Sequence, residues 1–472
     1  MAPLFANRFS RTLSLILLAA VFCGLGSTGG RSEALLLVEA ESGKILHAEN
    51  AGYPWYPASI TKLMTAYVTL KAVKEGRVRL DTLLTVSDNA VAQQPSKMGF
   101  PAGTQVTIDN ALKMLMVKSA NDMAVVLAEG VSGSVEAFAD EMNRASVRLG
   151  MVQSSWVNPN GLPAEGQVTS ARDMAILARA LFRELPEHDL YWHISAIKFG
   201  RRTIRNYNRL IDRYPGADGM KTGFICASGY NLVASATRDG RRLIAVVLGA
   251  PSGTTRAEVA AALLEKGFQG SKGLSWLTPS LGSVESVQPI AASPPNLRDE
   301  ICGRHRGRAR TDHAEEEEQQ HATGDSSAPA TAYTSITPEF RMNMAERQSL
   351  LGSWTPSMEP IRVSVIPKKG APDPEKVAEK PAKRVGKKKG KPAASAVATA
   401  EPPAEQAAED KPKKDKRRLA AKPAKPAMDA KPAPKVSREA KPTEAKTAVA
   451  PVKPAKPRPA KRKPAAADPA GE

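Results

Sequence analysis

The chain has 472 residues, and its 67 Lys and Arg against 48 Asp and Glu give a formal net charge of +19. The charge is unevenly placed, because residues 361–472 hold 30 Lys and Arg against 13 Asp and Glu, an excess of 17. The 37 Pro also indicate that part of the chain does not pack. These figures exclude a uniformly basic protein and predict a nearly neutral folded part with a basic extension.

Residues 1–34 predict a secretory signal peptide. Arg8 and Arg11 precede an apolar run over 13–26, and small residues then lead to Ala34, which is the order of regions in an exported precursor. The apolar run is too short for a comfortable membrane span. We expect cleavage after Ala34 and a mature protein that is exported and soluble, in the periplasm or at the cell envelope. A lipid anchor at Cys23 is a weaker alternative, since bulky residues precede it.

Residues 35–270 predict one compact domain. Two short apolar runs, 35–38 and 44–47, flank a turn and predict a β-hairpin. Apolar residues at helical spacing predict helices over 59–75, 111–129, 170–182 and 256–268. Two β-rich runs joined by a turn predict strands over 231–237 and 241–248. Strands at both ends with helices inserted between them indicate an α/β or α+β sandwich whose sheet joins distant parts of the chain.

Beyond residue 270 the periodic signals fade. Residues 271–360 predict an irregular linker region, and the Lys, Pro and Ala of 361–472 predict a disordered basic tail with too little apolar surface to pack. The tail has no aromatic residue, so stacking on nucleic-acid bases is unavailable and we expect no nucleic-acid partner. In an exported protein its charge favours anionic envelope polymers or lipid headgroups, with a plain solvated spacer as the alternative.

Three short motifs carry the chemistry. They are Ser59-Ile60-Thr61-Lys62, Ser119-Ala120-Asn121 and Lys221-Thr222-Gly223. Each alone occurs by chance and has a plain structural interpretation, as a helix start, a helix surface or a turn. The three in this order within one folded segment are instead typical of penicillin-binding proteins and class A β-lactamases.

The spacing of the first motif predicts a serine nucleophile with its base. Ser59 and Lys62 lie three residues apart, so both side chains project from one face of the first helical turn. A lysine with an ordinary pKa near about 10.4 is a poor base, but burial and a second cation lower that pKa, and Lys221 is the natural second cation. The backbone N–H of Ser59 is one candidate oxyanion donor.

The other two motifs predict a proton relay and a substrate cleft. Ser119 supplies a hydroxyl that can pass a proton to the leaving amine, and Asn121 can hold a substrate amide. Lys221 and Thr222 begin a strand and can attract a carboxylate, while Gly223 lets a substrate backbone approach closely. We therefore expect a substrate that ends in a free carboxylate.

Residues 35–270 resemble the low-molecular-mass D-alanyl-D-alanine carboxypeptidases, which are penicillin-binding serine peptidases. The matching stretches run over 57–66, 119–122, 158–162 and 218–223. The resemblance implies a β-lactamase/D,D-peptidase-like antiparallel sheet with flanking helices and an inserted helical region. It also implies removal of the terminal D-alanine from peptidoglycan stem peptides, with β-lactam antibiotics as covalent inhibitors and no cofactor.

The same resemblance implies roles for individual residues. Ser59 would be acylated, Lys62 would be its base, and Ser119, Asn121 and Lys221 would complete the catalytic set. The resemblance adds the backbone N–H of Phe224 as the second oxyanion donor and Arg256 near the terminal carboxylate, although a solvated or capping role for Arg256 is nearly as well supported. Two departures are Ile225, where the family often has Thr, and the absence of an apolar moment in the last 110 or so residues.

Three other functions stay open. A β-lactamase would need a second base for deacylation, and Glu165 lies in the right region, but residue 168 is Val where the usual pattern has Asn. D,D-endopeptidase action on cross-links uses the same chemistry with another leaving group. A non-catalytic wall-binding protein is disfavoured by the intact serines and lysines.

The remaining Cys and His residues predict no metal site. Cys302, His305, His313 and His321 have metal-like spacing, but their segment is polar and irregular and cannot orient ligands. The surroundings of Cys226 and Cys302 differ, so we expect them to stay unpaired, with Cys226 as a buried structural thiol. We interpret His188 and His193 as ordinary surface or packing residues.

Overall fold

The computed structural model describes residues 33–270, 281–303, 350–372 and 374–379. Most of the expected signal peptide and residues 380–472 of the expected tail lie outside this range, so those interpretations stay predictions. Within it, no helix is both long and apolar enough to cross a membrane.

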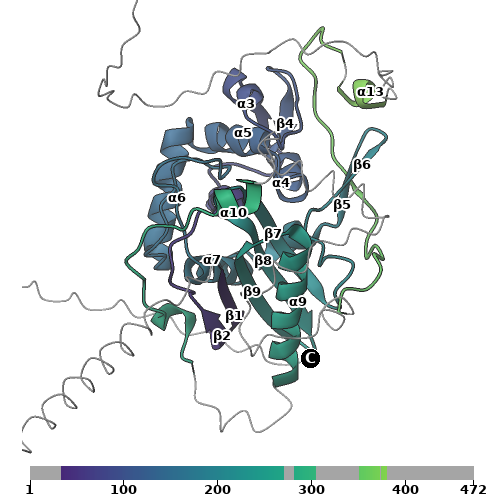
Figure 1. The fold of residues 1–472 in the computed structure, drawn as a ribbon. Coiled ribbons are helices and arrows are strands. Elements are labelled where there is room, and N and C mark those ends of the chain that lie inside the picture. The colour runs from purple at the N-terminus through teal and green to yellow at the C-terminus, as the bar shows by residue number, and fades with distance from the viewer. Residues whose placement is uncertain (1–32, 271–280, 304–349, 373, 380–472) are drawn as a thin grey trace, which may run out of the picture. The chain divides into compact units, whose positions relative to one another are not determined.

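A five-stranded antiparallel sheet is the framework of the domain (Figure 1). Its order is β2 (Ile45–Glu49), β1 (Ala34–Glu39), β9 (Arg241–Ala250), β8 (Gly229–Arg238) and β7 (Ala217–Ile225). β1 pairs with β9 from Ala34 opposite Leu248 to Glu39 opposite Leu243. The two ends of the domain therefore meet in one sheet, which confirms the predicted fold class.

Both faces of the sheet are covered. Leu35 and Leu37 of β1 pack in one cluster with helix α9 (Gly253–Gln269), whereas Leu36 and Val38 pack in another with α7 (Ala171–Glu184). Side chains of a strand alternate between faces. Every one of these residues is buried, so β1 is a continuous apolar run.

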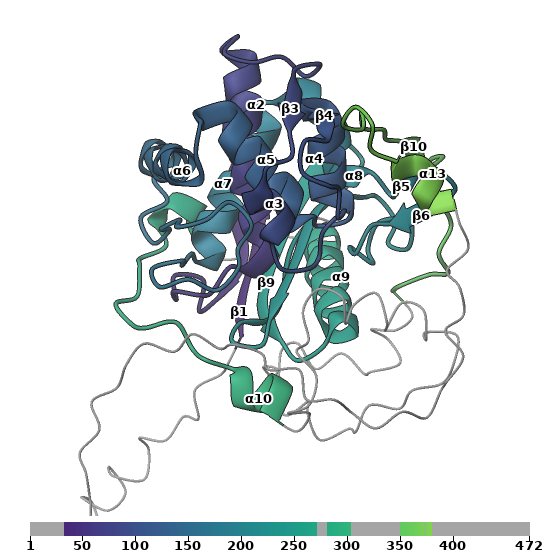
Figure 2. The same ribbon diagram turned by 90° about the horizontal axis from the view of Figure 1, so that it is seen from above.

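A helical region is inserted between β2 and the late strands, and its helices gather beside the sheet (Figure 2). Its elements before α7 are α2 (Lys62–Lys74), β3 (Leu83–Thr85), α3 (Asp88–Ala92), β4 (Gln105–Thr107), α4 (Ile108–Val117), α5 (Asn121–Ser132) and α6 (Val135–Leu149). Between α7 and β7 follow η2 (Pro186–His188), α8 (Leu190–His193), β5 (Ala196–Phe199) and β6 (Arg202–Arg205). β3 and β4 pair antiparallel, as do β5 and β6.

One predicted helix is wrong in a way that matters for the site. The expected helix over 111–129 is two helices, α4 and α5, separated at Lys118–Ala120. Ser119 has a left-handed backbone with φ of 60°, and Ala120 is extended. A left-handed residue cannot continue a right-handed helix, so the break turns the second motif out of the helix.

The domain does not close at residue 270. Downstream elements are η5 (Val284–Ser286), α10 (Arg298–Cys302), β10 (Ile361–Arg362) and α13 (Pro374–Glu379). Val284, Leu297 and Val363 are buried, and β10 pairs parallel with β5. Parts of the expected linker, and the first residues of the expected tail, therefore belong to the fold. The sequence did not predict this, because the buried apolar residues of these segments are isolated and show no periodic pattern.

The start of β1 bears on the signal peptide. Ala34 is buried and pairs with Leu248, and the backbone carbonyl of Glu33 accepts a hydrogen bond from Asn50. Cleavage after Ala34 would remove the first residue of the strand. Glu33 and Ala34 therefore belong to the folded domain, and the expected cleavage after Ala34 stays a prediction.

Candidate active site

Ser59 lies in a tight helical turn pressed against the edge strand of the sheet. The turn is η1 (Ala58–Thr61), which leads directly into α2. A Cβ on Gly223 of β7 would lie 2.9 Å from the backbone nitrogens of Ser59 and Ile60. Glycine is needed there because β7 passes too close for any side chain. The Ser59 side chain is consequently almost buried, with 6% of the residue exposed.

Two further residues fix this turn from outside. Asn231 of β8 donates from its amide to the backbone carbonyls of Tyr56 and Pro57, at 2.9 and 3.1 Å. Gly161 lies so close to the carbonyl oxygen of Ala58 that a Cβ would come within 1.8 Å of it. Neither residue was among the predicted site residues, although Gly161 belongs to one of the matching stretches; Asn231 had no signal beyond its place in a strand.

Lys62 is buried beside Ser59, and its amine donates hydrogen bonds to groups from three separate segments. Its Nζ donates to Ser59 Oγ at 2.9 Å, to Asn121 Oδ1 at 2.8 Å and to the backbone carbonyl of Asn160 at 2.7 Å. The first and second motifs, predicted separately, therefore meet at one amine. Asn160 enters the site from the 158–162 turn as a residue that sequence reasoning missed.

Lys221 faces the second motif from β7. Its Nζ donates to Ser119 Oγ at 3.0 Å and to the Thr222 carbonyl at 3.1 Å. The left-handed backbone of Ser119 described above is what directs this serine into the site rather than along a helix. The structure thus contains two buried lysine–serine pairs, joined through the segment 119–121.

The second motif is held by a loop at 93–99. Asn121 donates to the carbonyl of Gln94 at 2.8 Å, and the Asp122 carboxylate accepts from the backbone N–H groups of Met98 and Gly99 at 3.1 and 2.8 Å. Burial raises the pKa of Asp122 above its usual range, against the opposing effect of these hydrogen bonds. Asp122 is a positioning residue. It lies in one of the matching stretches, but its sequence context predicted no role for it.

The predicted substrate-binding residues divide into two groups. Thr222 and Gly223 lie on β7 beside Ser59, as expected. Phe224 turns its ring away to pack on Tyr230, with ring centroids 4.2 Å apart, so only its backbone can serve the site. Arg256 is 2% exposed in α9, donates to the carbonyl of Asn231 at 3.3 Å and stacks over Tyr230. Its predicted contact with a substrate carboxylate stays a prediction.

The predicted free thiols are wrong. Cys226, the residue after β7, and Cys302, the last residue of α10, form a disulfide with their Cα atoms 5.8 Å apart. The backbone N–H of Leu297 also donates to the carbonyl of Ala227 at 2.9 Å. The two cysteines are 76 positions apart in the sequence, and no local pattern indicates this return of the chain.

No cluster of three metal-ligating side chains exists in the described part of the chain. Cys302 is consumed by the disulfide, and His305, His313 and His321 lie outside the described residues.

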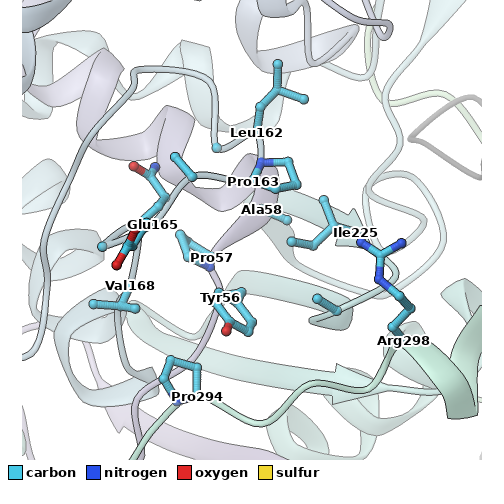
Figure 3. A pocket seen from close by; sticks show the side chains of 15 residues that line it. Tyr56, Pro57, Ala58, Leu162, Pro163, Glu165, Val168, Ile225, Pro294 and Arg298 are labelled. Atoms are coloured by element: carbon cyan, nitrogen blue, oxygen red, sulfur yellow. The ribbon is translucent and has the colours of Figure 1, made fainter. Parts of the chain in front are cut away.

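A pocket of about 480 Å³ opens beside the nucleophile turn (Figure 3). One wall is the turn itself at Tyr56–Ala58, the second is the loop 161–168, and the third holds Ile225, Pro294 and Arg298. The last two residues come from the segment that the disulfide ties to β7.

A buried Ser-x-x-Lys pair and a second lysine–serine pair, on a helix-flanked antiparallel sheet, define the class of penicillin-binding serine acyl-transfer enzymes. Comparison with known proteins agrees. A family model described as D-alanyl-D-alanine carboxypeptidase, peptidase family S11, matches residues 28–252. The D-alanyl-D-alanine carboxypeptidase of Streptomyces sp. strain K15 is 31% identical over 246 residues, which are 48% of this chain and 84% of that protein. The chain belongs to the D-alanyl-D-alanine carboxypeptidase family.

Other relatives are longer than the matched region. D-alanyl-D-alanine carboxypeptidase DacC of Escherichia coli is 38% identical over 245 residues, and the match covers 50% of this chain and 61% of that protein. Penicillin binding protein 5 of Haemophilus influenzae is a solved structure with 36% identity and a TM-score of 0.49, covering 52% of this chain and 73% of that one. The chain thus spans only about three fifths of the first curated relatives.

Proposed function

We propose that the protein is a serine-type D-Ala-D-Ala carboxypeptidase, which removes the terminal D-alanine from peptidoglycan stem peptides through an acyl-enzyme on Ser59. The observation that carries the proposal is the Lys62 amine, which contacts the Ser59 hydroxyl at 2.9 Å while Asn121 and Asn160 hold it in place. A positioned amine at hydrogen-bond distance is what a serine needs to become a nucleophile.

Acylation follows from this geometry. Lys62, in its neutral form, takes the proton of Ser59 as Oγ attacks the carbonyl carbon of the penultimate D-alanine. The backbone N–H groups of Ser59 and Phe224 stabilise the negative oxygen of the tetrahedral intermediate. The C–N bond then breaks. Ser119, in contact with Lys221 at 3.0 Å, passes its proton to the departing D-alanine amine and takes up the proton that Lys62 removed from Ser59, so Lys62 is neutral again.

Deacylation reverses these roles with water. A water molecule loses a proton to the same lysine and attacks the acyl carbon. The bond to Ser59 Oγ breaks, the lysine returns the proton to Ser59, and the shortened peptide leaves. A β-lactam acylates Ser59 by the same attack, but its leaving amine stays tethered to the acyl group, so the adduct persists where no separate base activates water.

The β-lactamase alternative is less well supported by the loop 158–168. This loop presents the Asn160 backbone carbonyl to Lys62, whereas Glu165 is exposed on the wall of the pocket beside Tyr56 and Pro57. D,D-endopeptidase action uses the same groups, and only the products distinguish it.

Export is part of the proposal. The Cys226–Cys302 disulfide supports an oxidising compartment, as does the signal-like N-terminus. Residues 380–472 have 26 Lys and Arg against 10 Asp and Glu, and we include in the proposal that this part tethers the enzyme to anionic envelope surfaces.

Digestion of purified muropeptides by the full-length mature protein, followed by mass analysis, tests the activity. Loss of one alanine from pentapeptides is the expected result, and monomers released from dimers would instead identify an endopeptidase. Labelled penicillin should give an adduct stable for minutes; turnover within seconds would favour the β-lactamase.

Sedimentation with isolated envelopes tests the tether. The truncation should end at residue 379, because β10 pairs with β5 and α13 is the last element that the structure describes. The full chain should sediment more than the truncated one at low salt and lose this excess at about 1 M salt, where the Debye length is about 3 Å. Equal sedimentation at low salt would exclude a tether.

A further inference from the structure

The pocket beside Ser59 has no role in the proposed reaction steps. Its walls include Pro57 and Ala58, which directly precede the nucleophile, and Ile225, two residues past Gly223 on β7. A substrate bound at Ser59 therefore borders this pocket. The pocket is where an upstream part of the same substrate could lie.

The direction of β7 decides which part of the substrate this is. Lys221 and Thr222 are proposed to attract the terminal carboxylate, and side chains of a strand alternate, so Lys221, Gly223 and Ile225 share a face. β7 is also the outermost strand of the sheet, an edge on which an extended peptide can lie. With the carboxylate end at Lys221, the chain upstream of the scissile bond runs past Gly223 toward Ile225.

The pocket has an apolar lining with two opposite charges. Leu162, Pro163, Ile225 and Pro294 supply apolar surface, and among the residues that the structure describes, the charged ones in the lining are Glu165 and Arg298. Figure 3 shows these two on opposite sides of the pocket, with the guanidinium of Arg298 extending from α10 toward Ile225.

Arg298 is available for a ligand. Its side chain is exposed, and among the described residues it has no ion pair or side-chain hydrogen bond. A guanidinium offers paired N–H donors that match a carboxylate. An apolar pocket with one arginine and one glutamate fits an aliphatic side chain that ends in both a carboxylate and an ammonium.

We propose that Arg298 is a specificity-determining residue that binds a carboxylate on the stem-peptide residue preceding the scissile D-Ala-D-Ala pair, with Glu165 facing the neighbouring ammonium. This rests on the proposed function, and it assigns a binding role to a residue beyond position 252, where the family match ends. The carboxylate must be free, since its amide would lose the charge that the guanidinium recognises.

The disulfide is the device that keeps Arg298 in place. Arg298 begins α10 and Cys302 ends it, so the bond to Cys226 anchors the short helix to the end of β7. The buried side chain of Leu297 and its hydrogen bond to Ala227 hold the other side. Opening the disulfide therefore loosens Arg298 without touching Ser59 or Lys62.

The test uses two peptides that end in D-Ala-D-Ala. In both, the side chain of the residue before D-Ala-D-Ala ends in an ammonium group. In one peptide this side chain also carries a carboxylate, and in the other it carries the corresponding carboxamide. The full-length enzyme should show a higher kcat/KM for the acid, by roughly 3- to 10-fold, the range for a partly exposed charge-assisted pair. Arg298→Gln should bring the acid-to-amide ratio close to one, and Arg298→Lys should keep part of it. Arg144→Gln, an exposed arginine on α6, is the matched control and should keep all of it.

Acylation by a small β-lactam separates this proposal from the proposed function. The Arg298 variants should label Ser59 at the wild-type rate, because that reagent does not reach the pocket. Cys302→Ser should lower the acid-to-amide ratio as Arg298→Gln does. A wild-type ratio near one, or a ratio unchanged in Arg298→Gln, overturns the assignment even if penicillin labels the enzyme normally; failure of penicillin to label the wild type overturns the proposed function instead.

Discussion

Two regions next to Ser59, called here the inner wall and the outer wall, are held together by different kinds of contact. The inner wall, η1 with β7 and the segment 119–121, is joined by buried hydrogen bonds among Ser59, Lys62 and Asn121 and by close backbone contacts at Gly161 and Gly223. The outer wall, α10 with Pro294, is exposed and depends on one disulfide and one buried leucine. Damage to the inner wall should stop the chemistry, whereas damage to the outer wall should change only which peptide is used and how stable the fold is.

The largest effect should come from the nucleophile. Ser59→Ala should abolish the penicillin adduct and carboxypeptidase activity, because Ser59 supplies the hydroxyl that lies 2.9 Å from the Lys62 amine. Intact-mass measurement after incubation with penicillin checks this, with unchanged thermal unfolding as the control for folding. An adduct of the expected mass on the variant would remove Ser59 from its assigned role.

The next effect concerns the base. Lys62→Ala should slow acylation by about 10² to 10⁴ while leaving reversible binding much less affected, since Lys62 acts on a proton. The wild-type acylation rate should rise with pH as an amine loses its proton, and the variant should lose this dependence. Stopped-flow acylation across pH measures both, and near wild-type acylation by the variant would contradict the base role.

A close backbone contact in the inner wall should contribute strongly to the stability of the fold. Gly161→Ala adds a Cβ that would lie 1.8 Å from the Ala58 carbonyl, at a residue with φ of 82°. We expect a loss of about 2 to 4 kcal/mol in the free energy of unfolding, from strain and overpacking, together with slower acylation.

Gly166→Ala is the matched control for this change. Gly166 lies in the same loop with φ of 81°, but its added Cβ would meet only Val157, at 3.6 Å. It should show the backbone strain alone, about 1 to 2 kcal/mol. Equal losses in urea unfolding for the two variants would mean that the close approach to Ala58 does not hold the nucleophile turn.

The smallest effect on chemistry should come from the outer wall. Cys302→Ser should lower the free energy of unfolding by roughly 2 to 4 kcal/mol, since the disulfide restricts a long loop of the unfolded chain. Acylation by a small β-lactam should remain at the wild-type rate. Reduced wild-type protein is the comparison, and a large loss of acylation would show that the two walls are not separable.

The residues of the inner wall could be predicted from the sequence and those of the outer wall could not, for a physical reason. Ser59, Lys62, Ser119 and Lys221 lie in short motifs whose spacing reflects one helical turn or one strand, so local pattern was enough. Asn231 and Asn160 act through backbone and side-chain contacts with distant residues, and nothing in their neighbours indicates this. The pairing of Cys302 with Cys226 requires the chain to return after 76 residues. This return is seen only in the structure, where Leu297 is buried next to α10. The same limit explains the merged helix over 111–129, because the left-handed backbone at Ser119 is imposed by the site.

The pairing of β1 with β9 has a consequence for the order in which the domain can form. β1 begins at Ala34 and its partner ends at Ala250, so the central strand of the sheet cannot be completed until more than 200 residues have been synthesised. Closing so long a loop is slow. The sheet is therefore completed late in synthesis, and the disulfide that joins Cys226 to Cys302 can form only after a further stretch of the chain has been added.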